Sequence, residues 1–243
     1  MEIIPLKEGD FFVNKKKEFR LLEEGEISND LKIAIQPFLI KVHNEYIMLD
    51  CGLGWLCNDK PVLLHLLEKI NIQPTEISRI LISHLHKDHI GGLGIIQNNY
   101  FLLNFPQATI YVQQREFEYA NSQKQSLSYD FKLIEALKNN SAVHWLNADS
   151  GHINDYIKYQ VTGGHTPYHQ AFWIKNSDTI AFYGADNLPA SAYLNYDIAY
   201  KSDYDGKKAK QQRINWKQEA LQYNWKILFY HDLKTPVTNL TAQ

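Results

Sequence analysis

The stretch that decides the fold is Ser83-His84-Leu85-His86-Lys87-Asp88-His89-Ile90-Gly91-Gly92, in which three histidines and one aspartate fall within six residues. The apolar residues 80–82 precede it and are typical of a buried strand, while the two glycines after it indicate a turn. Neutral imidazole and carboxylate groups are ligands that proteins offer to zinc, iron and manganese. Packing these groups together without a metal would be costly, because they lose their hydration. We therefore expect a metal site where a core strand ends, in preference to a solvated polar loop.

Length and composition limit the class of protein. The chain has 243 residues and an ordinary globular balance of apolar and charged residues, so we expect a single domain over residues 1–243. The net charge is −2 and no basic stripe is present, which argues against a nucleic-acid partner. Residues 1–10 lack the features of a signal peptide, and no apolar run reaches transmembrane length. The two cysteines match neither a disulfide framework nor a paired metal motif. We expect a cytoplasmic protein with no membrane partner.

Hydrophobic periodicity divides the predicted strands into two groups, before and after about residue 150. Residues 93–105 are apolar and aromatic, and we interpret them as a core helix or part of a cleft wall. Within this stretch, residues 100–105 would belong either to the core or to a dimer surface, so the sequence leaves a homodimer as a possible oligomeric state. We predict helices over residues 61–70, 114–120, 129–138 and 207–223, and strands over residues 33–42 (with a proline irregularity), 46–49, 79–82, 108–112, 143–146, 156–161, 171–175, 179–183 and 225–230.

A polar residue of the kind that binds metals follows three further predicted strands. His165 comes after residues 156–161, Asp186 after residues 179–183, and His231 after residues 225–230. Taken singly, each residue has an ordinary explanation as a structural histidine or a turn aspartate. Taken with the cluster at residues 84–89, all of them are explained by loops that meet at one edge of a layered sheet structure.

The pattern His84-x-His86-x-Asp88-His89, followed by His165, Asp186 and His231, resembles the signature of the metallo-β-lactamase superfamily. The resemblance extends over nearly the whole chain, including the loop at residues 49–52 and the stretch at residues 105–112. It implies an α+β fold, the four-layer αβ/βα sandwich, in which two mixed β-sheets lie face to face and helices cover them. The expected order of elements is compatible with that architecture.

The resemblance also implies two divalent metal ions, zinc in the first place, with manganese or iron as alternatives. Asp88 and Asp186 are the implied catalytic residues. Asp186 would bridge the two metals between which the hydroxide nucleophile forms, and Asp88 could orient that hydroxide or pass a proton to the leaving group. Metal binding can bring the pKa of water from ~15.7 to near 7. Carried over residue by residue, the first metal is held by His84, His86 and His165, the second by Asp88, His89 and His231, and Asp186 bridges them.

Within the superfamily, the stretch at residues 165–170 is similar to the N-acyl-homoserine lactonase-like branch. Asp186 argues against zinc β-lactamases, which lack a bridging aspartate there, and His86 argues against flavodiiron oxidoreductases. One departure concerns Pro189, since lactonases of that branch tend to place a substrate-facing tyrosine three residues after the bridging aspartate. Tyr193 or Tyr196 would have to replace it.

The resulting prediction is a hydrolase of a small-molecule lactone or carboxylic ester. Alternatives are a glyoxalase II-like thioester hydrolase, a phosphotriesterase, or a metal-stabilised binding protein without activity. Two residues outside the motif are candidates for supporting roles. Asp50 could accept a hydrogen bond from a metal-binding imidazole, and His169 could support the ligands or face the substrate.

Overall fold

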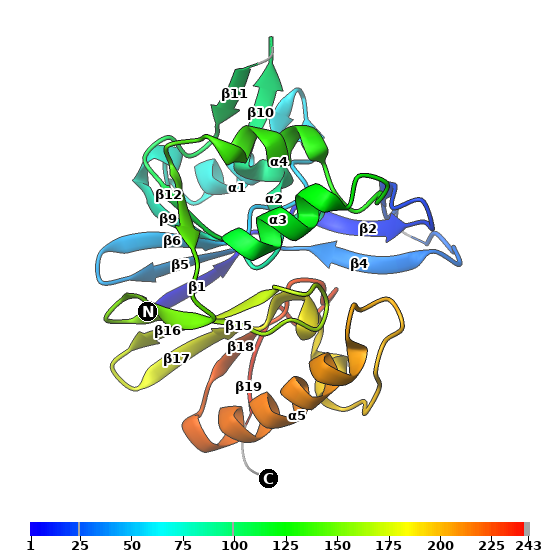
Figure 1. The fold of residues 1–243 in the computed structure, drawn as a ribbon, viewed down its shortest axis with the longest axis vertical. Helices are drawn as coiled ribbons and strands as arrows, with labels where there is room; N and C mark the ends of the chain where they lie inside the picture. Colours follow the sequence, from blue (N-terminus) through cyan, green and yellow to red (C-terminus); the bar gives the residue numbers. More distant parts are fainter. Residues whose placement is uncertain (24, 99, 241–243) are drawn as a thin grey trace.

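Two six-stranded sheets lie face to face in the computed structural model, which describes residues 1–23, 25–98 and 100–240 (Figure 1). In spatial order, the first sheet consists of β1 (Glu2–Pro5), β5 (Phe38–Val42), β6 (Glu45–Leu49), β9 (Ile77–Leu81), β12 (Thr109–Gln113) and β13 (Val143–Leu146). The second sheet consists of β14 (Ser150–Asn154), β15 (Ile157–Val161), β16 (Gln170–Asn176), β17 (Thr179–Tyr183), β18 (Lys226–Leu228) and β19 (Val237–Asn239). Both sheets are mixed, because β6, β9, β12 and β13 pair in parallel in the first and β17 and β18 in the second.

Alternation of side chains along β16 shows how the second sheet separates two cores. Phe172 and Ile174 point to the inter-sheet core, where they join Phe38 and Leu49 of the first sheet. Trp173 belongs to a different cluster on the outer face of the sheet. A strand reverses the direction of its side chains at every residue, so an apolar strand of this kind can face two cores at once.

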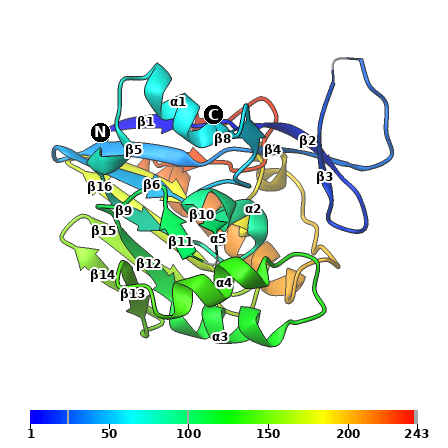
Figure 2. The ribbon, with the colours of Figure 1, turned by 90° about the horizontal axis from the view of Figure 1, so that it is seen from above.

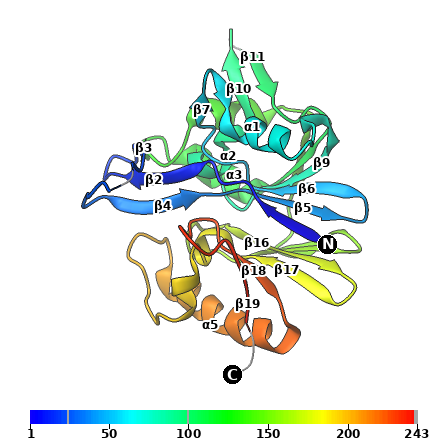
Figure 3. The same cartoon turned by 180° about the vertical axis from the view of Figure 1, so that it is seen from behind.

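Helices cover the outer face of each sheet, which completes the four layers (Figure 3). The first sheet packs against α1 (Val62–Lys69), α3 (Gln114–Ser122) and α4 (Phe131–Lys138), and the second packs against α5 (Gly206–Tyr223). The remaining helical segments are the single turn α2 (Lys87–Ile90) and the 3₁₀ turns Pro74–Glu76, Gly91–Leu93, Ala185–Asn187 and Ser191–Leu194. The predicted α+β sandwich is confirmed. No helix in the described ranges is both long and apolar enough to cross a membrane.

A small three-stranded sheet extends from one side of the sandwich, where β2 (Gly9–Val13) pairs with β3 (Phe19–Leu21) and β4 (Leu31–Ile35) (Figure 2). The sequence predicted one strand over residues 33–42, but the chain divides at Gln36 and Pro37 into β4 and β5, which belong to different sheets. Proline has no N–H to donate to a ladder, so a strand can change sheets at this point. The ribbon β7 (Leu56–Cys57)–β8 (Lys60–Pro61) precedes α1.

Residues 93–105, for which the sequence left a core helix or a cleft wall open, form neither, although Leu93 and Phe105 at the two ends are buried in the core. After the turn Gly91–Leu93, the chain forms a hairpin of β10 (Gly94–Gln97) and β11 (Tyr100–Leu103), while residue 99 lies outside the described residues. Ile95, Ile96 and Tyr100 are exposed, and none of these strand residues lines the cavity described below. Periodicity does not distinguish a short apolar hairpin from a buried helix, because burial depends on what the rest of the fold packs against it.

Candidate metal centre

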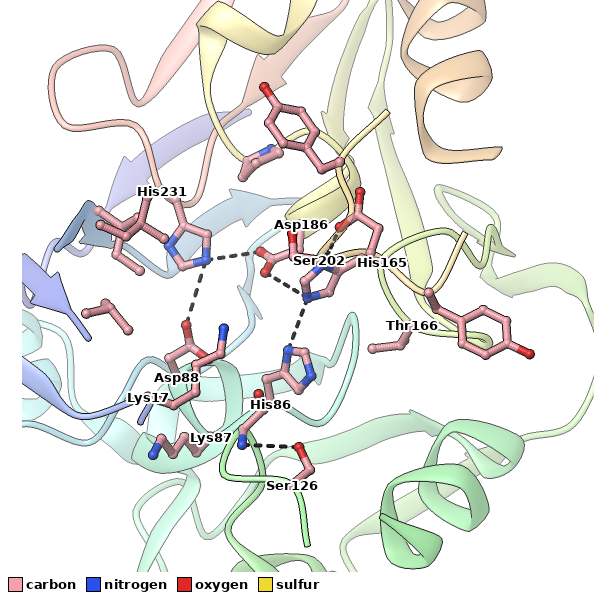
Figure 4. Close-up of a pocket in the computed structure, with 18 of the residues that line it drawn as sticks. Lys17, His86, Lys87, Asp88, Ser126, His165, Thr166, Asp186, Ser202 and His231 are labelled. Carbon is pink, nitrogen blue, oxygen red and sulfur yellow. Dashed lines mark hydrogen bonds and ion pairs between the residues drawn. The ribbon is translucent and has the colours of Figure 1, made fainter. Parts of the chain in front are cut away.

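The predicted ligand residues converge because their loops leave strands at the same edge of the sandwich (Figure 4). His84 and His86 follow the end of β9, and α2 carries Asp88 and His89 directly afterwards. Since β17 and β18 are parallel, their carboxyl ends meet the same edge. Asp186 follows β17, His231 follows β18, and His165 lies in the loop between β15 and β16.

Glycine is required where the loop that carries His165 approaches another part of the chain. Gly164 has a φ of +89°, and a Cβ there would lie 2.6 Å from Oδ1 of Asn187. That same Oδ1 accepts a hydrogen bond of 2.8 Å from the backbone N–H of His165. The close approach therefore holds His165 against the residue that follows Asp186 in the chain.

The ligand atoms form two groups. Those of His84, His86, His165 and Asp186 all lie within 4.8 Å of one another, and those of Asp88, His89 and His231 do the same. Each group contains nitrogen and carboxylate oxygen donors, which suits a divalent transition metal. All seven residues named from the sequence are present in this arrangement.

Asp186 faces both groups, with one oxygen toward each. Its Oδ2 lies 3.2 Å from Nε2 of His165 and 3.8 Å from Nε2 of His84. Its Oδ1 lies 3.2 Å from Nε2 of His89 and 3.1 Å from Nε2 of His231. A carboxylate in this orientation has the geometry needed to join two cation sites.

At His84, His86 and Asp186, electrostatics favours the protonation states that metal binding needs. Burial, reinforced by the neighbouring imidazoles, holds the pKa values of His84 and His86 well below their usual range, so both rings are neutral. Burial works against ionisation of Asp186, but His231, His89 and His165 outweigh it and hold the pKa of its carboxyl well below the usual range. The neutral imidazole and the ionised carboxylate are the metal-binding forms.

Two buried atoms provide a test of whether a metal fits. Nε2 of His89 and Oδ1 of Asp186 each make no hydrogen bond with any described residue. Burial also lowers the pKa of His89, but the carboxylates of Asp186, Asp50 and Asp88 together raise it well above its usual range. Buried polar atoms nearly always have a partner, and a cation between these two atoms would provide it. The residues present therefore fit a metal centre.

Asp50 supports the centre from beneath. Its Oδ2 lies 2.7 Å from Nδ1 of His89 and accepts hydrogen bonds from the hydroxyls of Ser83 and Tyr183, both at 2.6 Å. The backbone N–H of Ser83 donates to Oδ1 at 2.7 Å. The contact with His89 confirms the acceptor role that the sequence suggested, and it turns the other ring nitrogen of His89 toward the centre.

Two further supports were not found from the sequence. Oδ1 of Asp203 lies 3.0 Å from Nδ1 of His165, and the carbonyl oxygen of Ala34 lies 2.7 Å from Nδ1 of His231. Any residue type supplies a backbone carbonyl, so Ala34 carries no signal, and Asp203 lies in a polar loop without a motif. His169 is fully buried beside His84 and does not line the cavity, which makes its predicted substrate-facing alternative wrong.

A cavity of about 550 Å³ opens above the ligand residues. One wall comes from the small sheet, with Val13, Phe19 and Ile33, and the opposite wall is rich in tyrosines, including Tyr193 and Tyr200. Pro189 also lines the cavity, at the position where the resemblance led us to look for a tyrosine. Tyr196 is 57% exposed and does not line it, so Tyr193 is the better placed of the two alternatives.

A buried arginine holds the tyrosine wall. The rings of Tyr193 and Tyr200 stack with centroids 4.6 Å apart, and the guanidinium carbon of Arg213 lies 5.4 Å and 5.6 Å from them. Nη1 of Arg213 donates a 3.0 Å hydrogen bond to the carbonyl oxygen of Asn187. The wall is thereby attached to the loop that carries Asp186.

Comparisons with known proteins agree with this architecture. The chain is 28% identical over 162 residues to the N-acyl homoserine lactonase AttM of Azorhizobium caulinodans, a match that covers 63% of this chain and 48% of that protein. The chain thus spans about half the length of this curated relative. A second relative, the AttM lactonase of Agrobacterium fabrum, is 28% identical over 172 residues, which are 65% of this chain and 56% of that protein.

Among solved structures, the fold is similar to that of a probable metal-dependent hydrolase from Staphylococcus aureus. The TM-score is 0.79 at 19% identity, and the match covers 99% of this chain and 92% of that one. The family model of the metallo-beta-lactamase superfamily matches residues 34–213. Because this match spans well over half of the chain and includes all but one of the converging ligand residues, we conclude that the chain belongs to the metallo-beta-lactamase superfamily.

Proposed function

We propose that this chain is a dinuclear metal-dependent hydrolase that opens a lactone or cleaves a related carboxylic ester. The observation that carries the proposal is the orientation of Asp186, whose two oxygens face two different groups of histidines. A single metal would need only one of those groups. Two complete groups that share one carboxylate support a pair of ions.

In this proposal each ion has three ligands besides the shared carboxylate of Asp186. The first ion is held by His84, His86 and His165, and the second by Asp88, His89 and His231. Two divalent cations supply a hydroxide nucleophile near neutral pH and polarise the substrate carbonyl. Zinc is the metal that we favour, with manganese or iron as alternatives, because imidazole and carboxylate donors suit all three.

Asp88 is the residue that we assign to proton transfer. Its Oδ2 lies 3.8 Å from Nε2 of His231 and 4.0 Å from Nε2 of His89, which makes it less closely held than Asp186. It also lines the cavity. A carboxylate in that position can take a proton from the attacking water and pass it to the leaving oxygen.

Tyr193 is the residue that we assign to orienting the substrate. It lines the cavity with Asp186, and burial together with Tyr200 raises the pKa of its phenol, which therefore stays protonated. A protonated phenol can donate a hydrogen bond to the oxygen of the ester as negative charge develops there. It would replace the tyrosine that Pro189 does not provide.

The similarity to the AttM proteins supports a lactone substrate, since both are named N-acyl homoserine lactonases. The test is a rate comparison on protein loaded with zinc or manganese, with metal content measured by elemental analysis. We expect two metal ions per chain and faster hydrolysis of an N-acyl homoserine lactone than of a thioester or a phosphotriester. If the protein hydrolysed a thioester or a phosphotriester faster than the lactone, we would assign it to that class of hydrolase. Two bound ions with no hydrolysis of any of these would make the chain a metal-stabilised binding protein and end the proposal.

A further inference from the structure

Three lysines line the cavity, and two of them, Lys17 and Lys87, lie next to the proposed metal centre, whereas Nζ of Lys32 lies 5.1 Å from the centre of the Phe12 ring. Lys17 is exposed in the turn between β2 and β3, and Lys87 is half-buried at the start of α2. Both line the cavity, and Figure 4 shows them on the same side of it, together with Asp88. Among the described residues, neither lysine forms an ion pair within 4.0 Å.

The turn holds Lys17 in place, so its position is a feature of the fold. Oδ1 of Asn14 accepts hydrogen bonds from the N–H groups of Lys16, at 2.8 Å, and Glu18, at 3.1 Å. The carbonyl oxygen of Asn14 accepts another from the N–H of Lys17, at 3.0 Å. Lys17 has a φ of +57°, a left-handed conformation that favours glycine or asparagine. A lysine at this position is therefore not explained by the needs of the backbone.

Among the described residues, Lys17 and Lys87 are not paired with the acidic residues of the cavity. The acidic residues that line it are Asp88, Asp186 and Asp203, and each of them faces a histidine. Ammonium groups that no carboxylate pairs with attract ions of the opposite sign. Bound metal ions would increase that effect.

From this arrangement we infer that the preferred substrate carries an anionic group, a carboxylate or a phosphate, at a distance from the reacting carbonyl that reaches Lys17 and Lys87. The inference rests on the proposed function and adds a substrate class to it. The apolar side chains of Val13, Phe19 and Ile33 line the same part of the cavity and would contact the carbon chain between the two groups. Lys17 and Lys87 would then act in specificity, through charge, without taking part in bond breaking.

The first experiment compares two esters with the same leaving group, phenyl butyrate and the monophenyl ester of glutaric acid, on metal-loaded protein. The glutarate ester differs in bearing a carboxylate at the far end. A third ester, with a phosphonate in place of that carboxylate, distinguishes the two sources of charge. We expect kcat/KM for at least one anionic ester to exceed that for the neutral ester by about fivefold to tenfold. The ratio should fall toward one in 0.5 M sodium chloride, because salt screens exposed charges.

Variants of neighbouring lysines provide the matched control. Lys17→Gln should remove most of the preference, and Lys17→Arg should restore it. Lys16→Gln removes the same charge from the same turn, but Lys16 does not line the cavity, so the preference should stay as in the wild type. Equal rates on all three esters in the wild type would overturn the inference. An equally large loss of preference in Lys16→Gln would also overturn it, since net charge would then explain the effect.

Binding provides a readout that does not depend on catalysis. Calorimetry compares glutarate with butyrate on metal-loaded protein, because both present one carboxylate and only glutarate presents a second. Tighter binding of glutarate in the wild type, lost in Lys17→Gln and kept in Lys16→Gln, would support the anion site even if no ester were hydrolysed. In that case the proposed function would fail while the anion site stood. If the two acids bound equally and the neutral ester were hydrolysed rapidly, the anion site would fail while the proposed function stood.

Discussion

The base of the cavity and its walls are built in different ways. At the base, the predicted ligand residues follow strand ends of the sandwich, and His89, His165 and His231 are each fixed by a further group, such as the fully buried Asp50 behind His89. The walls come from segments outside the two main sheets, namely the turn that carries Lys17 and the segment that carries Tyr193. Wall residues include exposed side chains. Under the proposed function, the sandwich would hold the metal ions and the added segments would contact the substrate.

Hydrogen bonds join the two regions at several points. Arg213 attaches the tyrosine wall to the carbonyl of Asn187, and Asp203 attaches the same segment to His165. Each of these hydrogen bonds reaches a loop that carries a predicted ligand, but neither Arg213 nor Asp203 is itself a predicted ligand. Substitutions in the base should therefore change metal binding and rate together, while those in the wall should change rate or preference and leave the metal content intact.

The largest effect is expected at the base, in Asp186→Asn. The amide removes the charge that faces both groups of histidines, so metal content should fall from two ions per chain toward one. Turnover should fall by about 10²–10³-fold. Elemental analysis and initial rates measure the two quantities side by side. Asp178→Asn, in the exposed turn between β16 and β17, is the matched control, and equal rates in both variants would contradict the bridging role.

A smaller effect is expected from a support of the base, Glu8. This buried carboxylate accepts hydrogen bonds from the N–H groups of Leu53 and Gly54, next to the loop that follows Asp50. Burial raises the pKa of Glu8 to about 8, despite the opposing effect of those N–H groups. The folded protein thus holds this proton more tightly than the unfolded chain does.

The sign of the resulting pH dependence follows from that difference. The stabilisation is present in full below the unfolded pKa of about 4.5 and is lost as the pH rises through about 8. Relative to Glu8→Gln, the wild type should lose about 2–4 kcal/mol of unfolding free energy between pH 5 and pH 9. Urea denaturation of both proteins across this range measures it. Parallel stability curves for the two proteins would show that Glu8 keeps an ordinary pKa.

The smallest effect is expected in the wall, in Tyr193→Phe. Loss of one hydrogen bond to the reacting oxygen should lower kcat by about tenfold, while metal content stays at the wild-type value. Tyr196→Phe removes a hydroxyl from an exposed side chain outside the cavity and should change neither quantity. If Tyr193→Phe lowered the metal content instead, the distinction between base and wall would not hold at this residue.

The ligand residues could be predicted because their signal is local and repeated. The four polar residues within residues 84–89 form a motif by themselves, and His165, Asp186 and His231 each follow a recognisable apolar strand. The structure brings all seven together in two neighbouring groups. Asp50 could be suggested for a similar reason, since it ends a strand beside the motif strand. Asp203 and the carbonyl of Ala34 could not, because nothing in their neighbourhood distinguishes them.

Other features depended on packing between distant parts of the chain. Within residues 93–105, Leu93 and Phe105 are buried in the core, whereas Ile95, Ile96 and Tyr100 of the hairpin β10–β11 are exposed. The division of residues 33–42 between two sheets depends on which strands pair with β4 and β5. β4 pairs with β2 in the small sheet, whereas β5 pairs with β6 in the first large sheet.

The sequence alone indicated the kinds of metal ligand and the strand ends that carry them, because these follow from residue chemistry and local periodicity, and its motif resembled a family whose fold is the αβ/βα sandwich. Only the tertiary structure decided how the two oxygens of Asp186 are shared, which tyrosine faces the cavity, and that Lys17 lies beside the centre without an acidic partner. Those features depend on distances between segments far apart in the chain. Such distances are set by the packing of the two sheets and the segments added to them, and no local pattern encodes them.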